Sequence, residues 1–206
     1  MNDPEYEALS KAKRQAGSGN PEGAAETLES YLETDPHNTK ARMQLARTLI
    51  YDLKNLDEGL MQMDIVLDLE PENTDAMKAM VTVLAKHKKN NKETCALYEK
   101  LLRISPDADL YNAYAIFSRI QMTDFKRSAE YYEKAISLNP KEPAYHRNYA
   151  VLLLNDLRDY EKAKSELEAV LELDPADAAA KRNYDLLMKK KFGPDGRLKK
   201  RTMFRR

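Results

Sequence analysis

The side chains that could perform catalysis or bind a metal are few and scattered. The three histidines, His37, His87 and His146, stand at different places within the chain's pattern and show no metal-ligand spacing. The single cysteine, Cys95, has no neighbouring base in the sequence to activate it as a nucleophile. The segment "GSGN" (17–20) lacks the Lys-Ser/Thr of a phosphate-binding loop and predicts a turn. We therefore expect no enzyme activity, no cofactor and no metal site.

The composition is typical of a helical protein with much exposed surface. Charged residues make up 33% of the 206 residues and aromatic residues 8%, with six glycines and no tryptophan. The longest apolar run, "YAVLLL" (149–154), is far shorter than the roughly 20 residues of a membrane-spanning helix. The first 15 residues lack the apolar core of a signal peptide, and a lone cysteine fits a reducing compartment. We expect a cytoplasmic protein without a membrane span.

An internal repeat organises most of the chain. Five segments end alike, as "YLETDP", "VLDLEP", "LLRISP", "AISLNP" and "VLELDP". The turn "YDLKNLDEG" (51–59) also matches "NDLRDYEKA" (155–163), at an offset of three repeats. Self-similarity at such a period is typical of repeat architectures. The prolines that end the five segments, at intervals of 35, 35, 34 and 35 residues, are Pro36, Pro71, Pro106, Pro140 and Pro175.

Within each repeat the apolar spacing is that of two helices. Met77, Met80, Val81 and Leu84 form one stripe at helical spacing in the third repeat. A second helix then runs into the proline, which ends it because proline lacks an amide hydrogen and restricts the preceding residue. Each repeat is therefore predicted to be a helical hairpin with one buried stripe. Such a hairpin needs neighbours to cover that stripe, so the hairpins must stack.

The period, the small residue opening the second helix and the terminal proline resemble the tetratricopeptide repeat family over roughly residues 5–191. Thr94 stands where alanine is usual in the third repeat, and the family's Trp is absent. The resemblance implies an all-α fold: a right-handed superhelical α-solenoid of about five hairpins plus a C-terminal capping helix. The pattern is carried by Ala24, Leu28, Tyr31 and Pro36 in the first repeat, and by Ala163, Leu167, Val170 and Pro175 in the fifth.

The domain organisation follows from where the pattern stops. Residues 1–191 are expected to form the solenoid, in which 177–191 parallel the first helix of the previous repeat and form the capping helix. The segment "FGPDG" (192–196) then breaks the helix. Residues 192–206 hold too few apolar groups to offset the entropy of ordering, so we expect a disordered tail.

Stacked hairpins present their first helices along one concave face, which we expect to bind a peptide of acidic character. Arginine side chains there would hold carboxylates through charge-assisted hydrogen bonds. The competing interpretation is that these are ordinary solvated residues of a helix face. The positions predicted to line the groove are Met43, Arg47, Tyr51, Lys78, Thr82, Lys86, Asn112, Ile116, Arg119, Arg147, Val151, Asn155, Arg182 and Lys189.

Some members of the resembled family hold a partner's C-terminal carboxylate in a two-carboxylate clamp. That clamp needs asparagine in successive first helices. Thr82 and Ile116 occupy the required positions in the third and fourth repeats. The sequence therefore argues against a clamp of this type.

The C-terminal end carries a charge opposite to the rest of the chain. Nine of the 34 basic residues but only one of the 34 acidic residues lie in 189–206. Three interpretations compete: a solubilising tail, contact with nucleic acid or the ribosome with Phe192 and Phe204 stacking on bases, and contact with an anionic membrane or acidic protein. The residues predicted to make tail contacts are Arg197, Lys199, Lys200, Arg201, Phe204, Arg205 and Arg206.

The function expected from these patterns is a non-catalytic scaffold or adaptor that binds a protein or peptide partner in its groove, with the basic tail as a second contact. The alternative is a ribosome- or RNA-associated factor anchored through that tail. The sequence leaves the identity of the partner and the oligomeric state open.

Overall fold

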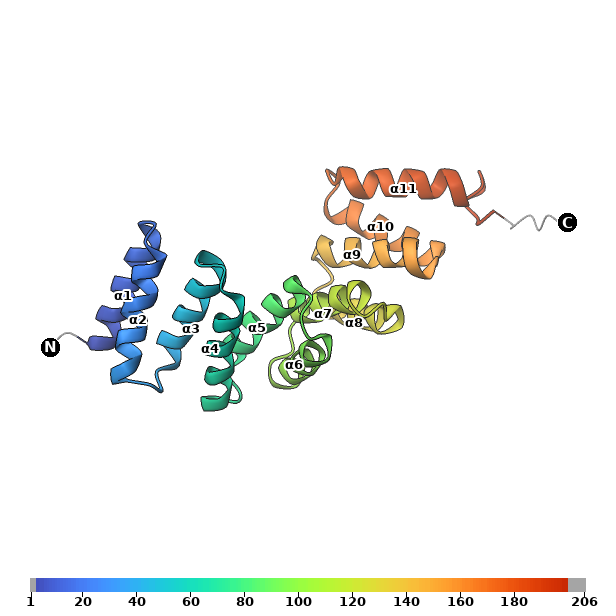
Figure 1. Cartoon of the computed structure of the whole chain (residues 1–206). Coiled ribbons are helices and arrows are strands. Elements are labelled where there is room, and N and C mark those ends of the chain that lie inside the picture. The colour runs from blue at the N-terminus through green and yellow to red at the C-terminus, as the bar shows by residue number, and fades with distance from the viewer. Residues whose placement is uncertain (1–2, 200–206) are drawn as a thin grey trace, which may run out of the picture. The chain divides into compact units, whose positions relative to one another are not determined.

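The computed structural model describes residues 3–199, and this part of the chain is all-α, with eleven α-helices and two π-helical segments (Figure 1). The chain divides into two compact units, Met1–Ile104 (unit 1) and Ser105–Arg206 (unit 2). Unit 1 contains α1 (Pro4–Gly17), α2 (Pro21–Thr34), α3 (Thr39–Arg47), η1 (Thr48–Asp52), α4 (Leu56–Leu69), α5 (Thr74–His87) and α6 (Asn91–Ile104). Unit 2 contains α7 (Ala108–Ile120), α8 (Phe125–Leu138), α9 (Pro143–Leu152), η2 (Leu153–Leu157), α10 (Tyr160–Leu173) and α11 (Ala178–Lys191).

The helices pair as five hairpins followed by α11, so the predicted stack of helical hairpins with a capping helix is confirmed. Short polar side chains fix most of the helix starts. Asn38 and Asn73 each accept a hydrogen bond from the backbone N–H three residues on, at 2.9 Å, and Asp107 does so at 2.7 Å. Such caps satisfy an amide that would otherwise lack a partner. The turn after each proline therefore places the next helix by a local interaction.

A small residue lies where the second helix of each hairpin crosses the first. Ala24, Thr94, Ser128 and Ala163 are completely buried, and Gly59 is buried at the same place in the second hairpin. The Thr94 hydroxyl donates to the Asn90 carbonyl oxygen at 3.0 Å, and the Ser128 hydroxyl donates to the Ala115 carbonyl oxygen at 2.8 Å. These bonds explain why polar residues are tolerated at a position where alanine was expected.

Replacing Gly59 with alanine is expected to lower the free energy of unfolding by about 1–2 kcal/mol. A Cβ at residue 59 would lie 2.3 Å from Ile50 Cγ1 and 3.0 Å from the Ala46 carbonyl oxygen. Overpacking costs about 1–3 kcal/mol, and a contact as close as 2.3 Å places this change in the upper part of that range, so the cost exceeds the roughly 1 kcal/mol gained from better helix propensity. Urea unfolding of the Gly59→Ala chain measures the difference. Gly17→Ala is the matched control, because no atom lies within 4 Å of its new methyl group. A Gly59→Ala chain more stable than the native one would contradict the prediction.

The two matching turn sequences form matching π-helical turns. The backbone N–H of Asn55 donates to Leu49 O at 2.7 Å, and that of Asp159 donates to Leu153 O at 3.0 Å. Lys54 and Arg158 then adopt left-handed conformations, with φ of 58° and 56°. A π-turn absorbs a residue that a regular α-helix cannot accommodate. In both hairpins the turn with the matching sequence is thus built as a widened end of the first helix.

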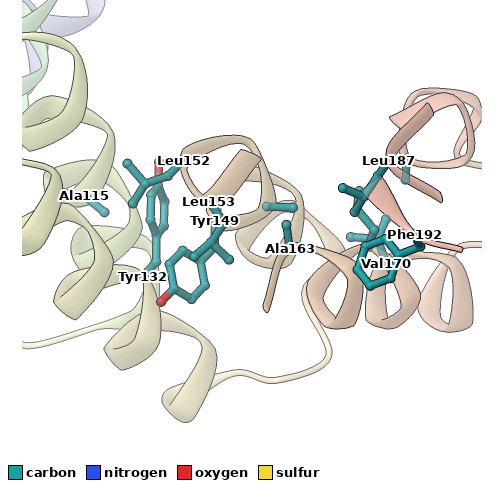
Figure 2. Close-up of a cluster of buried hydrophobic side chains, with 12 residues drawn as sticks. Ala115, Tyr132, Tyr149, Leu152, Leu153, Ala163, Val170, Leu187 and Phe192 are labelled. Carbon is teal, nitrogen blue, oxygen red and sulfur yellow. The ribbon is translucent and has the colours of Figure 1, made fainter. Parts of the chain in front are cut away.

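The core of unit 2 is rich in tyrosine (Figure 2). The Tyr132 and Tyr149 rings have centroids 5.6 Å apart and are almost completely buried. Burial raises the pKa of each phenol to about 12, because the charged phenolate would lose its hydration. The Tyr149 hydroxyl donates to Glu133 Oε1 at 2.7 Å, so its polar end has a partner. Both tyrosines therefore act as core residues, and the hydroxyl of Tyr149 is bonded to a carboxylate.

Residues 192–199 differ from the disordered tail that we expected from the sequence. Phe192, predicted to belong to a disordered segment, is only 3% exposed and packs in the core of unit 2 near Val170 and Leu187 (Figure 2). It forms an isolated antiparallel bridge with Leu198, and Gly193 N donates to Arg197 O at 2.8 Å. Residues 192–199 therefore form a turn held against the helices. One buried aromatic side chain supplies the apolar contact that composition alone did not reveal.

Candidate functional site

A hollow of about 560 Å³ lies within unit 1, against the first helices of its hairpins. We call it the unit 1 hollow. Its wall combines apolar, polar and charged side chains from α1, α3, η1 and the start of α5. The lining residues are Leu9, Lys13, Ala16, Thr39, Lys40, Met43, Gln44, Arg47, Thr48, Tyr51, Asp52, Asn73 and Asp75.

Contacts between α1 and α3 hold the wall of the hollow in place. The Gln44 amide Nε2 donates to the Leu9 carbonyl oxygen at 3.0 Å. Lys40 Nζ lies 2.8 Å from Glu5 Oε1, and Asn38 Nδ2 donates to the other carboxylate oxygen of Glu5 at 2.9 Å. The hydrogen bond from Lys40 lowers the pKa of Glu5, and the same bond raises the pKa of Lys40. Lys40 is therefore already neutralised by this chain.

The π-turn η1 brings two further side chains to the hollow. Tyr51 and Asp52 lie at its end, and Tyr51 is 44% exposed although it is a large aromatic residue. The backbone N–H of Leu53 donates to Thr48 O at 3.0 Å, and Lys54 Nζ donates to the Tyr51 carbonyl oxygen, so the backbone at this point is hydrogen-bonded within the turn. π-turns are frequent at functional sites. An exposed tyrosine on a fixed backbone provides a ready contact surface at low entropic cost.

The charges of the hollow are mixed. Lys13 and Arg47 are exposed and form no ion pair with any residue in 3–199. Asp52 and Asp75 contribute carboxylates to the same wall. The hollow can therefore receive an acidic group at Lys13 or Arg47 and a basic group at Asp52 or Asp75. Its surface is less uniformly basic than the sequence-based groove.

Three of the predicted groove residues, Met43, Arg47 and Tyr51, come together in this hollow. Sequence reasoning missed Lys13, because it placed no groove position on the helix of residues 4–17. The repeat itself could have indicated that this helix takes part. Leu9 and Gln44 are one repeat length apart in the sequence, and the structure places them in contact. Lys78, Thr82 and Lys86 are exposed on α5 and do not line the hollow.

In unit 2 two of the three predicted groove arginines, Arg119 and Arg147, are already paired. Arg119 Nε lies 2.5 Å from Asp156 Oδ2, and Arg147 Nε lies 2.6 Å from Asp177 Oδ2. Asn112 Oδ1 likewise accepts from Asn148 Nδ2 at 3.1 Å. The carboxylates that we expected a partner to supply are therefore supplied, at both arginines, by the neighbouring repeat.

The other predicted residues of unit 2 lie at separate places. Ile116 packs partly buried against the core, and Val151 is half-buried. Asn155 lines a second hollow of about 260 Å³ together with Leu186 and Lys190. Arg182, Lys189, Arg197 and Lys199 are exposed. Lys200, Arg201, Phe204, Arg205 and Arg206 lie outside the described residues.

The ion pair of Asp177 gives a pH-dependent contribution to stability. Its carboxylate accepts from the backbone N–H groups of Ala179 and Ala180 at 2.9 Å each. The Ala180 N–H, together with Arg147, lowers the pKa of Asp177, because both favour the charged form. A lowered folded pKa means that the contribution is complete above the unfolded pKa. It is lost as the pH falls through the folded pKa.

Asp177→Asn is expected to be less stable than the native chain by about 1 kcal/mol at neutral pH, because asparagine still caps the helix but forms no ion pair. The difference in melting temperature should begin to shrink as the pH falls through about 4, the unfolded pKa, and should vanish only below the lowered pKa of the folded carboxylate. Thermal denaturation across this range measures it. A difference that stays constant with pH would contradict the assigned ion pair.

The described residues offer few side chains for metal binding or catalysis. No three His, Cys, Asp or Glu side chains within 3–199 gather as metal ligands would. His146 is a packed histidine: Nδ1 lies 2.7 Å from Glu166 Oε2, and Nε2 lies 3.0 Å from the Pro140 carbonyl oxygen. In the same part of the chain, no helix is long and apolar enough to cross a bilayer.

Comparison with known proteins agrees with this architecture. A sequence model of the tetratricopeptide repeat family matches residues 118–177. No curated protein matches the chain. Among solved structures, MamA from Desulfovibrio magneticus RS-1 is 22% identical, with a TM-score of 0.74 over 87% of this chain and 99% of that one. YrrB, described as a TPR protein with an unusual peptide-binding site, is 22% identical, with a TM-score of 0.64 over 80% of this chain and 84% of that one. PilF from Pseudomonas aeruginosa is 19% identical, with a TM-score of 0.69 over 90% and 83%.

Proposed function

Since the chain is a tetratricopeptide repeat protein, we propose that it is a non-catalytic scaffold that binds a peptide segment of a protein partner in the unit 1 hollow. Proteins built from such repeats bind protein partners. The proposal rests on the hollow itself, whose wall contains an exposed tyrosine and two cations that form no ion pair with the residues in 3–199. The peptide-binding site described for YrrB, which has a similar fold, supports the same role.

The lining residues suggest what such a peptide contains. Leu9, Met43 and Tyr51 offer apolar contact area, which favours an aliphatic or aromatic side chain. Arg47 and Lys13 favour a carboxylate beside it, because hydrogen bonds between charged groups are stronger than those between neutral ones. We infer a peptide that carries an apolar residue close to an acidic one. A basic residue further along would meet Asp52 or Asp75.

The test is the binding of synthetic peptides to the purified full-length chain. An array of peptides would vary one apolar residue and the sign of the charge next to it. Arg47→Glu is expected to weaken binding of the acidic peptides about tenfold, since a charge-assisted hydrogen bond contributes roughly 1.5 kcal/mol. Tyr51→Ala should weaken binding of acidic and basic peptides alike, because it removes contact area without changing charge.

The matched control is Lys92→Glu, which makes the same charge reversal at an exposed position of α6 outside the hollow. It should leave peptide binding unchanged. The proposal fails if Arg47→Glu and Lys92→Glu weaken binding equally, since the effect would then reflect overall charge. It also fails if no peptide of the array binds in a manner sensitive to Arg47 or Tyr51.

A further inference from the structure

The C-terminal end of unit 2 carries a dense set of cations. Residues 178–199 contain seven basic and two acidic residues. Six of these basic side chains are exposed and form no ion pair with any residue in 3–199. We call this set the C-terminal basic surface. It consists of Lys181, Arg182, Lys189, Lys190, Arg197 and Lys199.

Local geometry keeps these cations together. Arg182 and Lys189 are two turns apart on α11, so they project from the same side of the helix, and Lys190 lies about 100° further around it. The turn then folds back onto the end of α11. Lys199 N donates to Lys191 O at 2.7 Å, and Lys199 Nζ donates to Lys189 O at 2.7 Å. The cation of Lys199 therefore lies beside the last turn of the helix, where it also compensates the helix dipole.

Exposed aliphatic side chains lie among these cations. Leu186 is 51% exposed on α11, and Leu198 is 39% exposed between Arg197 and Lys199. The aromatic side chains nearby are buried or already make contacts within this chain. Phe192 is buried, the Tyr184 hydroxyl donates to Glu168 at 2.9 Å, and Lys191 Nζ lies 4.5 Å from the centre of the Tyr160 ring.

We propose that the C-terminal basic surface binds the surface of an anionic phospholipid bilayer. Clusters of four to eight Lys and Arg on an amphipathic helix attract acidic headgroups, at roughly 1 kcal/mol for each cation. Exposed leucines add apolar contact at the boundary between headgroups and acyl chains. Binding to single-stranded nucleic acid uses aromatic platforms on which bases stack. The burial of Phe192 removes the platform expected there, so the described residues favour lipid. This inference is independent of the peptide role of unit 1.

Co-sedimentation of the full-length chain with vesicles tests the proposal. Vesicles of phosphatidylcholine alone would be compared with vesicles that also contain phosphatidylserine. We expect binding to the second kind only. The double substitution Lys189→Gln and Lys190→Gln should weaken it about 25-fold, since each cation contributes about fivefold. Leu186→Ser with Leu198→Ser should also weaken binding, although the net charge stays the same.

The matched control neutralises Lys126 and Lys141, two exposed lysines of unit 2 outside this surface. Lys126→Gln with Lys141→Gln makes the same charge change and should leave vesicle binding within about twofold of the native chain, because neither side chain would face the headgroups. Absence of binding to phosphatidylserine vesicles would overturn the proposal. So would an equal loss in both lysine pairs, or a chain that retards single-stranded RNA in a gel but ignores the vesicles.

Discussion

The Phe192→Ala chain is expected to lose about 3–5 kcal/mol of unfolding free energy, the range for deleting a buried aromatic side chain. Phe192 is 3% exposed and belongs to the same core cluster as Leu167, Val170 and Leu187 (Figure 2). Its loss would leave a cavity at the end of the stack, where no further hairpin follows α11 within the described residues. Urea unfolding of the full-length chain, followed by circular dichroism, measures the change in the transition that includes unit 2.

Leu198→Ala is the control for this experiment, because Leu198 lies across the bridge from Phe192 but is 39% exposed. Surface substitutions of this kind usually change stability by about 0.5 kcal/mol or less. A Phe192→Ala chain within 1 kcal/mol of the native one would show that the turn does not hold the core.

The burial of Phe192 also decides how the tail should be deleted. A chain that ends at Lys191 removes a core residue, so a deletion that probes the tail alone must keep residues up to Lys199.

His146→Leu is expected to destabilise unit 2 by about 2–4 kcal/mol. The ring is 7% exposed and fills the space between Glu166 and the Pro140 carbonyl oxygen. Leucine has a similar volume but no N–H, so the oxygen to which the ring N–H donates would lose its partner. A buried acceptor left without a donor costs about 1–3 kcal/mol, and more when it is charged. Thermal and urea denaturation of the variant measure this effect.

The double substitution His146→Leu with Glu166→Leu distinguishes lost hydrogen bonds from lost packing. Replacing both partners by apolar groups of similar size can be nearly neutral, because no charged oxygen is then left without a donor. We therefore expect the double variant to recover at least half of the stability lost in His146→Leu. If the double variant is instead clearly less stable than His146→Leu alone, the His146–Glu166 contact contributes little to the free energy of unfolding.

Much of the fold could be predicted from the sequence, because the repeat carries its own local signals. Each proline ends a second helix, and a capping side chain starts the helix that follows. The small residue represented by Ala24 and Ala163 marks where two helices cross, since only a short side chain fits there. Such signals act over a few residues and recur five times, so a single sequence reveals them.

The residues of the candidate site could be predicted only in part. Met43, Arg47 and Tyr51 follow from the helical stripe of one repeat, and they do line the unit 1 hollow. Lys13 enters the same hollow from α1, and Asp52 enters it because the π-turn widens the end of the first helix. Neither position can be read from the apolar period of one helix. Each depends on how two elements pack.

The sequence by itself determined the hairpins, their number and the charge of the C-terminal end, because these depend on local spacing and composition. Only the tertiary structure decided which charges are free. Arg119 and Arg147 find Asp156 and Asp177 in the neighbouring repeat, whereas Arg47 finds no acidic partner among residues 3–199. The fate of Phe192 was decided in the same way, since burial depends on the surface that α10 and α11 present to it. Pairing and burial are set by residues far apart in the chain, and no local pattern records them.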